Sequence, residues 1–193
     1  MLDFTPVRQK QTTIQQVAEG LTRADLAELT AEMVARQLTL IEGVDDAAVT
    51  MVPDDPAAND TFAADPADVG LAWTLGHVIV HTTASAEEAA GQALMLARGV
   101  PVTERSRVEV PWQEATSAEF VRGRLRESLR MRLAMLEAWP DRPDLENLYV
   151  YTPNSAGLNA MARFLGGLSH DDSHLGQIEA IVDQARAKTA AAR

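Results

Sequence analysis

Four long stretches of this chain repeat apolar residues every three or four positions. That spacing places the apolar side chains on one face of a helix, and the many Ala, Leu, Glu, Gln and Arg residues favour helix formation. Helices of this length bury their apolar faces by packing against one another. The sequence therefore predicts an all-α protein built as a four-helix bundle. The predicted helices run from about Arg23 to Glu42, Leu71 to Arg98, Thr116 or Ser117 to Trp139, and Leu158 to Ala187.

The segments between these stretches carry residues that start or stop helices. Thr22 is expected to cap the first helix, and Pro140 is expected to stop the third. Irregular connections are predicted over about residues 45–70 and 140–157, and they are long enough to allow crossovers in the bundle. The sequence contains no internal repeat, so we predict that residues 1–193 form a single domain.

The charge and the missing cysteines exclude several classes of function. The chain has 17 Lys and Arg against 28 Asp and Glu, a formal net charge of −11. That balance argues against nucleic acid or an anionic membrane as partner, because binding phosphates needs a basic surface. The absence of cysteine excludes disulfides, thiolate metal sites and a thiol nucleophile of the protein's own. With no apolar run of membrane-spanning length and no signal-peptide core at the N-terminus, we predict a cytoplasmic protein.

The four histidines of the chain form two pairs, His77 with His81 and His170 with His174. Residues four apart share one face of a helix, and imidazole nitrogens bind Zn, Cu, Ni and Fe. A single histidine on an apolar face is most often a satisfied core residue, but two such pairs on two helices favour a metal site. The spacing leaves two arrangements open. Four histidines would close the site, whereas three would leave a position for an exchangeable ligand.

Two motifs in these helices resemble those of a known family. Residues 73–81, WTLGHVIVH, place a tryptophan eight residues before a histidine, and residues 170–178, HDDSHLGQI, place two histidines before Gly-Gln-Ile. Together they resemble the second-helix and closing motifs of the DinB/YfiT-like superfamily. The resemblance implies an up-down-down-up bundle that holds one divalent metal ion, often Zn or Ni, with Fe or Mn as further candidates. The ligands that it implies by position are His81, His170 and His174.

The resemblance also implies a chemistry. The family includes S-transferases that use the low-molecular-weight thiols bacillithiol or mycothiol, so we expect a metal-dependent enzyme that transfers such a thiol to an electrophilic small molecule, and a homodimer. A divalent cation deprotonates a coordinating thiol, and a thiol co-substrate would supply the nucleophile that this cysteine-free chain lacks. Two alternatives stay open: a hydrolase that uses metal-bound water, and a non-catalytic bundle with a closed four-histidine site.

Further residues near the histidines are candidates for supporting roles. His77 lies outside the implied ligand set, and we expect it to line the pocket without permanent ligation. Gln177, Asp171 and Glu88 are candidates for contacts that orient the ligands. Glu88 could also be an added ligand or a general base, although a surface position is the commoner outcome for a glutamate. No Glu-x-x-His motif is present, so a ferritin-like di-iron site is unsupported, and no catalytic base is identified.

Two further predictions concern a tryptophan and a group of arginines. Trp73 is expected to lie at the start of the second helix and to pack against the end of the bundle. Five arginines on the third helix are expected to form a solvated face with local ion pairs. These arginines are Arg122, Arg124, Arg126, Arg130 and Arg132. The alternative is that three of them, spaced four apart, bind a carboxylate or phosphate of a substrate or thiol cofactor; these are Arg122, Arg126 and Arg130.

Overall fold

A computed structural model describes residues 2–61, 66–151 and 156–191 of the chain. These residues form seven α-helices and no strand, which confirms the all-α prediction. Residues 62–65 and 152–155, within the two predicted irregular connections, lie outside the described residues. Among the helices described, none combines the length and the apolar character that spanning a lipid bilayer requires. The bundle consists of α3 (Arg23–Leu40), α5 (Leu75–Ala97), α6 (Ala118–Glu137) and α7 (Ala160–Ala191).

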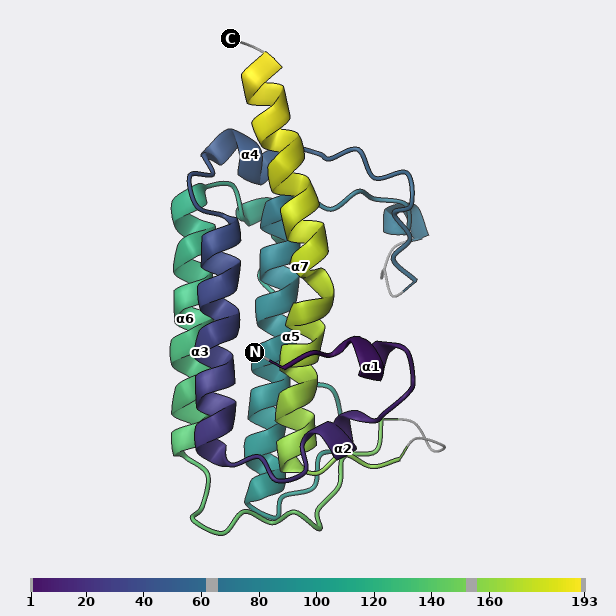
Figure 1. Cartoon of the computed structure of the whole chain (residues 1–193), viewed down its shortest axis with the longest axis vertical. Helices are drawn as coiled ribbons and strands as arrows, with labels where there is room; N and C mark the ends of the chain where they lie inside the picture. Colours follow the sequence, from purple (N-terminus) through teal and green to yellow (C-terminus); the bar gives the residue numbers. More distant parts are fainter. Residues whose placement is uncertain (1, 62–65, 152–155, 192–193) are drawn as a thin grey trace.

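The helix order is up-down-down-up (Figure 1). α3 and α7 run in one direction, and α5 and α6 run in the other. Each of α3 and α5 packs against both α6 and α7. Because the neighbours α5 and α6 are parallel, the chain between them must return along the whole length of the bundle. We call this segment, residues 98–117, the crossover segment.

The helix ends follow the capping side chains. Thr22 accepts a hydrogen bond from the backbone N–H of Asp25, which confirms the predicted start of α3. The prediction for the second helix was four residues too long at its start, because Thr74 has an extended backbone and caps α5 at the N–H of His77. Trp73 therefore precedes α5 instead of belonging to it.

Short helices occupy the connecting segments. α1 (Thr5–Arg8) and α2 (Ile14–Val17) precede the bundle, and η2 (Trp112–Glu114) lies in the crossover segment. The connection between α3 and α5, predicted to be irregular, contains α4 (Asp46–Thr50) and η1 (Pro66–Asp68). Asp45 caps α4 through the N–H of Ala48, and Asp46 accepts a hydrogen bond from the N–H of Ala118 at the start of α6.

The α5–α7 interface is the most extensive in the bundle. It depends on small residues: a β-carbon placed on Gly167 would lie 2.8 Å from Cβ of Ala89 and 3.3 Å from Cα of Ala86. Real β-carbons essentially never come as close as 2.8 Å to another carbon, so any residue larger than glycine would force the two helices to shift. This close approach brings the His81 face of α5 against the histidines of α7.

Two arginines predicted to lie on a solvated face instead join helices. Arg124 of α6 pairs with Glu87 of α5 and is mostly buried, and Arg132 lies in the core. Nη1 of Arg132 donates to Oδ2 of Asp171 at 2.7 Å, and both side chains are almost fully buried. The contact joins α6 to α7, and the two opposite charges compensate each other away from water. Arg130 does lie on a solvated face, where it pairs with Glu127 as expected.

Replacing Gly167 with alanine should destabilise the protein by about 1–3 kcal/mol, because the added methyl group overpacks the α5–α7 interface. Urea unfolding followed by circular dichroism measures this change. Gly176 lies on the exposed side of the same helix with open space around its Cβ position. Gly176→Ala is therefore a matched control, expected to stabilise α7 by about 0.5–1 kcal/mol. Equal stabilisation by both substitutions would show that the interface relaxes and that its close approach is not required.

Candidate metal centre

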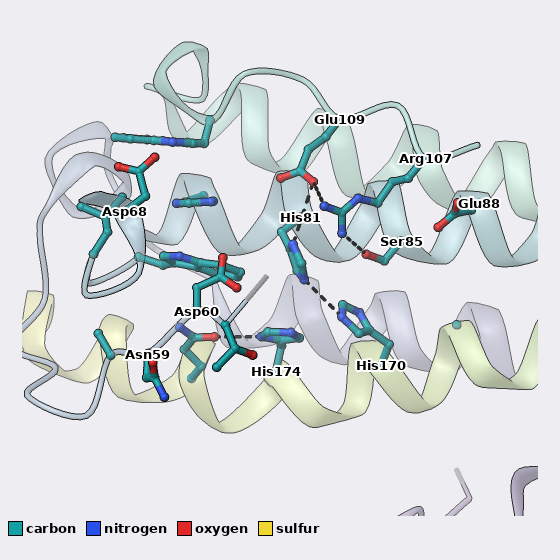
Figure 2. A pocket seen from close by; sticks show the side chains of 18 of the residues that line it. Asn59, Asp60, Asp68, His81, Ser85, Glu88, Arg107, Glu109, His170 and His174 are labelled. Carbon is teal, nitrogen blue, oxygen red and sulfur yellow. Dashed lines mark hydrogen bonds and ion pairs between the residues drawn. The ribbon is translucent and has the colours of Figure 1, made fainter. Parts of the chain in front are cut away.

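Three imidazoles converge between α5 and α7 (Figure 2). His81 projects from α5 toward His170 and His174 on α7, and one ring nitrogen of each lies within 4.8 Å of the other two. Nε2 of His81 lies 3.1 Å from Nε2 of His170. Two nitrogens that share a tetrahedral ion at bond lengths of about 2.0–2.1 Å lie roughly 3.3 Å apart. The arrangement therefore fits one small divalent ion.

Burial keeps these imidazoles neutral. It lowers the pKa of His81 to about 2 and that of His170 to about 4, and it also lowers the pKa of His174. The neighbouring imidazoles lower the pKa of His81 further. A neutral imidazole presents a lone pair to a metal ion, whereas imidazolium does not. The donor set thus suits a metal at neutral pH.

Two polar side chains lie against the outer nitrogens of the cluster. Oε1 of Gln177 lies 2.8 Å from Nδ1 of His174, a hydrogen bond that leaves Nε2 of His174 facing the cluster. Oε2 of Glu109 lies 3.9 Å from Nδ1 of His81. Sequence reasoning considered Gln177 but missed Glu109. Glu109 points into the pocket from a segment outside the predicted helices, beside Val108, which is 85% exposed, so no helical periodicity marked it as a site residue.

His77 lies apart from the group of three. Its ring stacks between Trp73, at a centroid distance of 4.3 Å, and Trp112, at 5.0 Å. Trp73 also lies 4.6 Å from the ring of His81 and 6.0 Å from that of His174. The two tryptophans and His77 therefore form an aromatic wall beside the imidazole cluster, and the structure does not assemble a four-histidine site.

The structure places Asp171 and Glu88 away from the three imidazoles. Asp171 forms its ion pair with Arg132 in the core, so the expectation that it orients a histidine is corrected. Glu88 is 7% exposed, contrary to the expected surface position. Its carboxylate accepts hydrogen bonds from the N–H of Ser106 at 2.7 Å and from Arg105 at 3.2 Å. Glu88 thus holds the crossover segment against α5.

The crossover segment forms one wall of the pocket. Arg107 pairs with Glu109 at 3.1 Å and donates to Ser85 of α5 at 3.2 Å. The connection between α4 and α5 supplies another wall, where Asn59, Asp60 and Asp68 lie at the opposite end from Glu88 (Figure 2). The cavity between these walls is open to solvent on one side and has a volume of about 910 Å³. That volume suits a small molecule, and the imidazole cluster opens into it.

A family model described as the DinB superfamily matches residues 7–178 of the chain. The chain belongs to the DinB superfamily. The matched region contains all four histidines, so the DinB-superfamily match and the three-histidine group agree with each other. A search of curated proteins gave no match, and a search of solved structures gave none either. Membership in the DinB superfamily and the cluster of neutral imidazoles together fit a metal-binding protein.

Removing the Glu88 side chain should release the crossover segment from α5. In Glu88→Ala the N–H of Ser106 loses its acceptor, so its hydrogen exchange should accelerate by roughly tenfold or more. Hydrogen–deuterium exchange of peptides spanning residues 104–109 measures the change.

The neighbouring glutamate provides the control for this experiment. Glu87 pairs with Arg124 of α6 instead of the crossover segment, so Glu87→Ala should leave the exchange of residues 104–109 unchanged. Equal acceleration in both variants would mean that general destabilisation, and not the Glu88 contacts, controls the crossover segment.

Proposed function

We propose that this protein is a metal-dependent transferase that joins a low-molecular-weight thiol to an electrophilic small molecule. The observation that carries the proposal is the position of the imidazole cluster, which has three members and opens into a cavity of about 910 Å³. Three protein ligands and one accessible position are typical of catalytic metal sites, whereas structural sites are closed by four. The stacking of His77 between two tryptophans supports the open arrangement.

The proposed ligands are His81, His170 and His174, with Zn or Ni as the ion. When bound, the divalent ion would supply the positive charge that favours thiolate over thiol at neutral pH. Gln177 would hold the tautomer of His174. Glu109 would favour a proton on Nδ1 of His81, which leaves the lone pair of Nε2 available to bind the metal ion.

The remaining residues of the pocket would bind and shield the reactants. The aromatic wall of Trp73, His77 and Trp112 offers an apolar surface for the carbon skeleton of the electrophile and limits the access of water. In the proposed reaction the thiol releases its proton to solvent. A sulfur lone pair then forms the bond to the electrophilic carbon, and the leaving group departs with its bonding electrons. The chain needs no cysteine, because the nucleophilic sulfur belongs to the co-substrate.

The purified protein should carry about one divalent ion per chain, held by three imidazoles. Substituting His81, His170 or His174 by alanine should weaken metal binding by more than the roughly 10- to 100-fold typical for loss of a hydrogen-bonded neighbour of a ligand. His77→Ala is the matched control, one helical turn from His81, and should retain nearly full metal content. Elemental analysis measures the metal content of each variant, and competition with a chelator measures its metal affinity. Equal loss in His77→Ala and His81→Ala would identify His77 as a ligand and favour the closed, non-catalytic site.

The metal-loaded protein should accelerate the conjugation of bacillithiol or mycothiol to monochlorobimane, measured by fluorescence. His81→Ala should lower the rate to that of the uncatalysed reaction, because it removes a donor from the cluster. A fully metal-loaded protein that accelerates neither thiol would contradict the proposal. Hydrolysis of an activated ester by the same preparation would then favour the hydrolase alternative.

A further inference from the structure

The face of α7 that carries two of the three imidazoles continues beyond them to Arg163. This residue precedes His170 by seven positions, so the two share one side of the helix about 10.5 Å apart along its axis. Both line the same cavity, together with Gly166 and Gly167 between them. A β-carbon on Gly166 would find only Nη1 of Arg163 nearby, at 3.8 Å. On α7, therefore, no side chain lines the cavity between Arg163 and His170.

The Arg163 side chain is held in place without an ionic partner. Its Nε donates to Oε1 of the buried Gln92 at 2.7 Å. Its guanidinium carbon lies 5.3 Å from the ring centroid of Tyr149. Within residues 2–61, 66–151 and 156–191, Arg163 forms no ion pair, and its Nη atoms donate no hydrogen bond. Burial lowers the pKa of Arg163, the effect expected of a cation that is partly removed from water.

The other two arginines of the cavity differ from Arg163, because each has a carboxylate partner. Arg107 pairs with Glu109, and Arg105 pairs with Glu88. Glu88 also accepts a hydrogen bond from the N–H of Ser106, so its carboxylate is already engaged. Glu88 also attracts Arg163 electrostatically at longer range. One carboxylate beside two guanidiniums leaves a net charge of one positive unit at this end of the cavity.

We propose that Arg163 binds a carboxylate on the thiol or on the electrophile, at the far end of the cavity from the reacting sulfur. The two Nη groups of a guanidinium match the two oxygens of a carboxylate. A single net charge beside Glu88 suits a monoanion better than a dianionic phosphate. The inference rests on the proposed function, since it deepens that function by naming the substrate class: a molecule with its reactive group and an anionic group separated by about two helical turns.

Two thiols that differ only at the far end test this anchor. Mercaptohexanoate ends in a carboxylate and mercaptohexanol in a hydroxyl, while each carries the same terminal thiol. Isothermal titration calorimetry of the full chain supplied with Co²⁺ should show the acid binding at least about tenfold more tightly than the alcohol, as expected for a charge-assisted hydrogen-bonded pair. Equal affinity of the two thiols for the wild-type chain would overturn the anchor without any variant.

Substitutions of Arg163 test whether this residue causes the preference for the acid over the alcohol. Arg163→Gln should reduce the acid-to-alcohol affinity ratio to about one while leaving binding of the alcohol nearly unchanged, and Arg163→Lys should retain part of the ratio. Arg186→Gln removes an exposed arginine from the other end of α7 and should retain all of it. If Arg163 had a purely structural role, Arg163→Gln would weaken the binding of both thiols equally. An unchanged ratio in Arg163→Gln would overturn the proposal, and if that variant fails to fold, the wild-type comparison of the two thiols decides.

The same samples separate this inference from the proposed function. Ligation of Co²⁺ by a thiolate adds a charge-transfer absorption band, which reports on the sulfur and not on the carboxylate. If neither thiol changes the absorption spectrum, the proposed thiol chemistry is wrong, and the anchor is still judged by the calorimetric ratio. If both thiols change the spectrum but bind with equal affinity, the thiol chemistry is supported and the anchor is overturned.

Discussion

At Gly167 the helices α5 and α7 approach so closely that a β-carbon would lie 2.8 Å from Cβ of Ala89. The imidazole cluster depends on this contact, because His81 belongs to one helix and both of its neighbours belong to the other. Interiors pack too densely to absorb the extra volume of a larger residue at such a crossing. The helices would have to separate, and the 3.1 Å between Nε2 of His81 and Nε2 of His170 would widen with them. The contact at Gly167, three residues from His170, thus determines how closely the histidines of the two helices approach each other.

The parallel arrangement of α5 and α6 has a second consequence for the site. Two parallel neighbours need a connection that runs back along the bundle, and in this protein that connection lies over α5. Glu88 holds it there through the N–H of Ser106 and through Arg105. The crossover segment therefore brings Glu109 to His81 and forms one wall of the cavity. The parallel arrangement of α5 and α6 thus accounts for both the long connection and one wall of the pocket.

Charge is distributed unevenly around that cavity. The imidazoles are neutral because burial disfavours their protonated forms, and two arginines are compensated by Glu88 and Glu109. In a protein with a net charge of −11, a partly buried arginine with no carboxylate partner among the described residues is an unusual feature. Arg163 and His170 lie on the same face of α7 and line the same cavity, which is the basis for the proposed carboxylate anchor.

The sequence by itself determined the local features: four amphipathic helices, the cap at Thr22, and two histidine pairs whose spacing places each pair on one helix face. Local periodicity and capping depend on residues within a few positions of one another, so they can be recognised without the fold. Three properties were decided only by the tertiary structure: the burial of Arg132 against Asp171, the contacts of Glu88, and the approach of Glu109 to His81. Each of these contacts joins residues of different elements. The position of a charged residue in a helical pattern does not reveal whether a residue of another element will pair with it. The two histidine pairs have the same spacing, yet His77 does not join the imidazole cluster as His81 does. Its ring stacks against Trp73 and Trp112, which come from segments outside α5, so the sequence spacing alone could not show this difference.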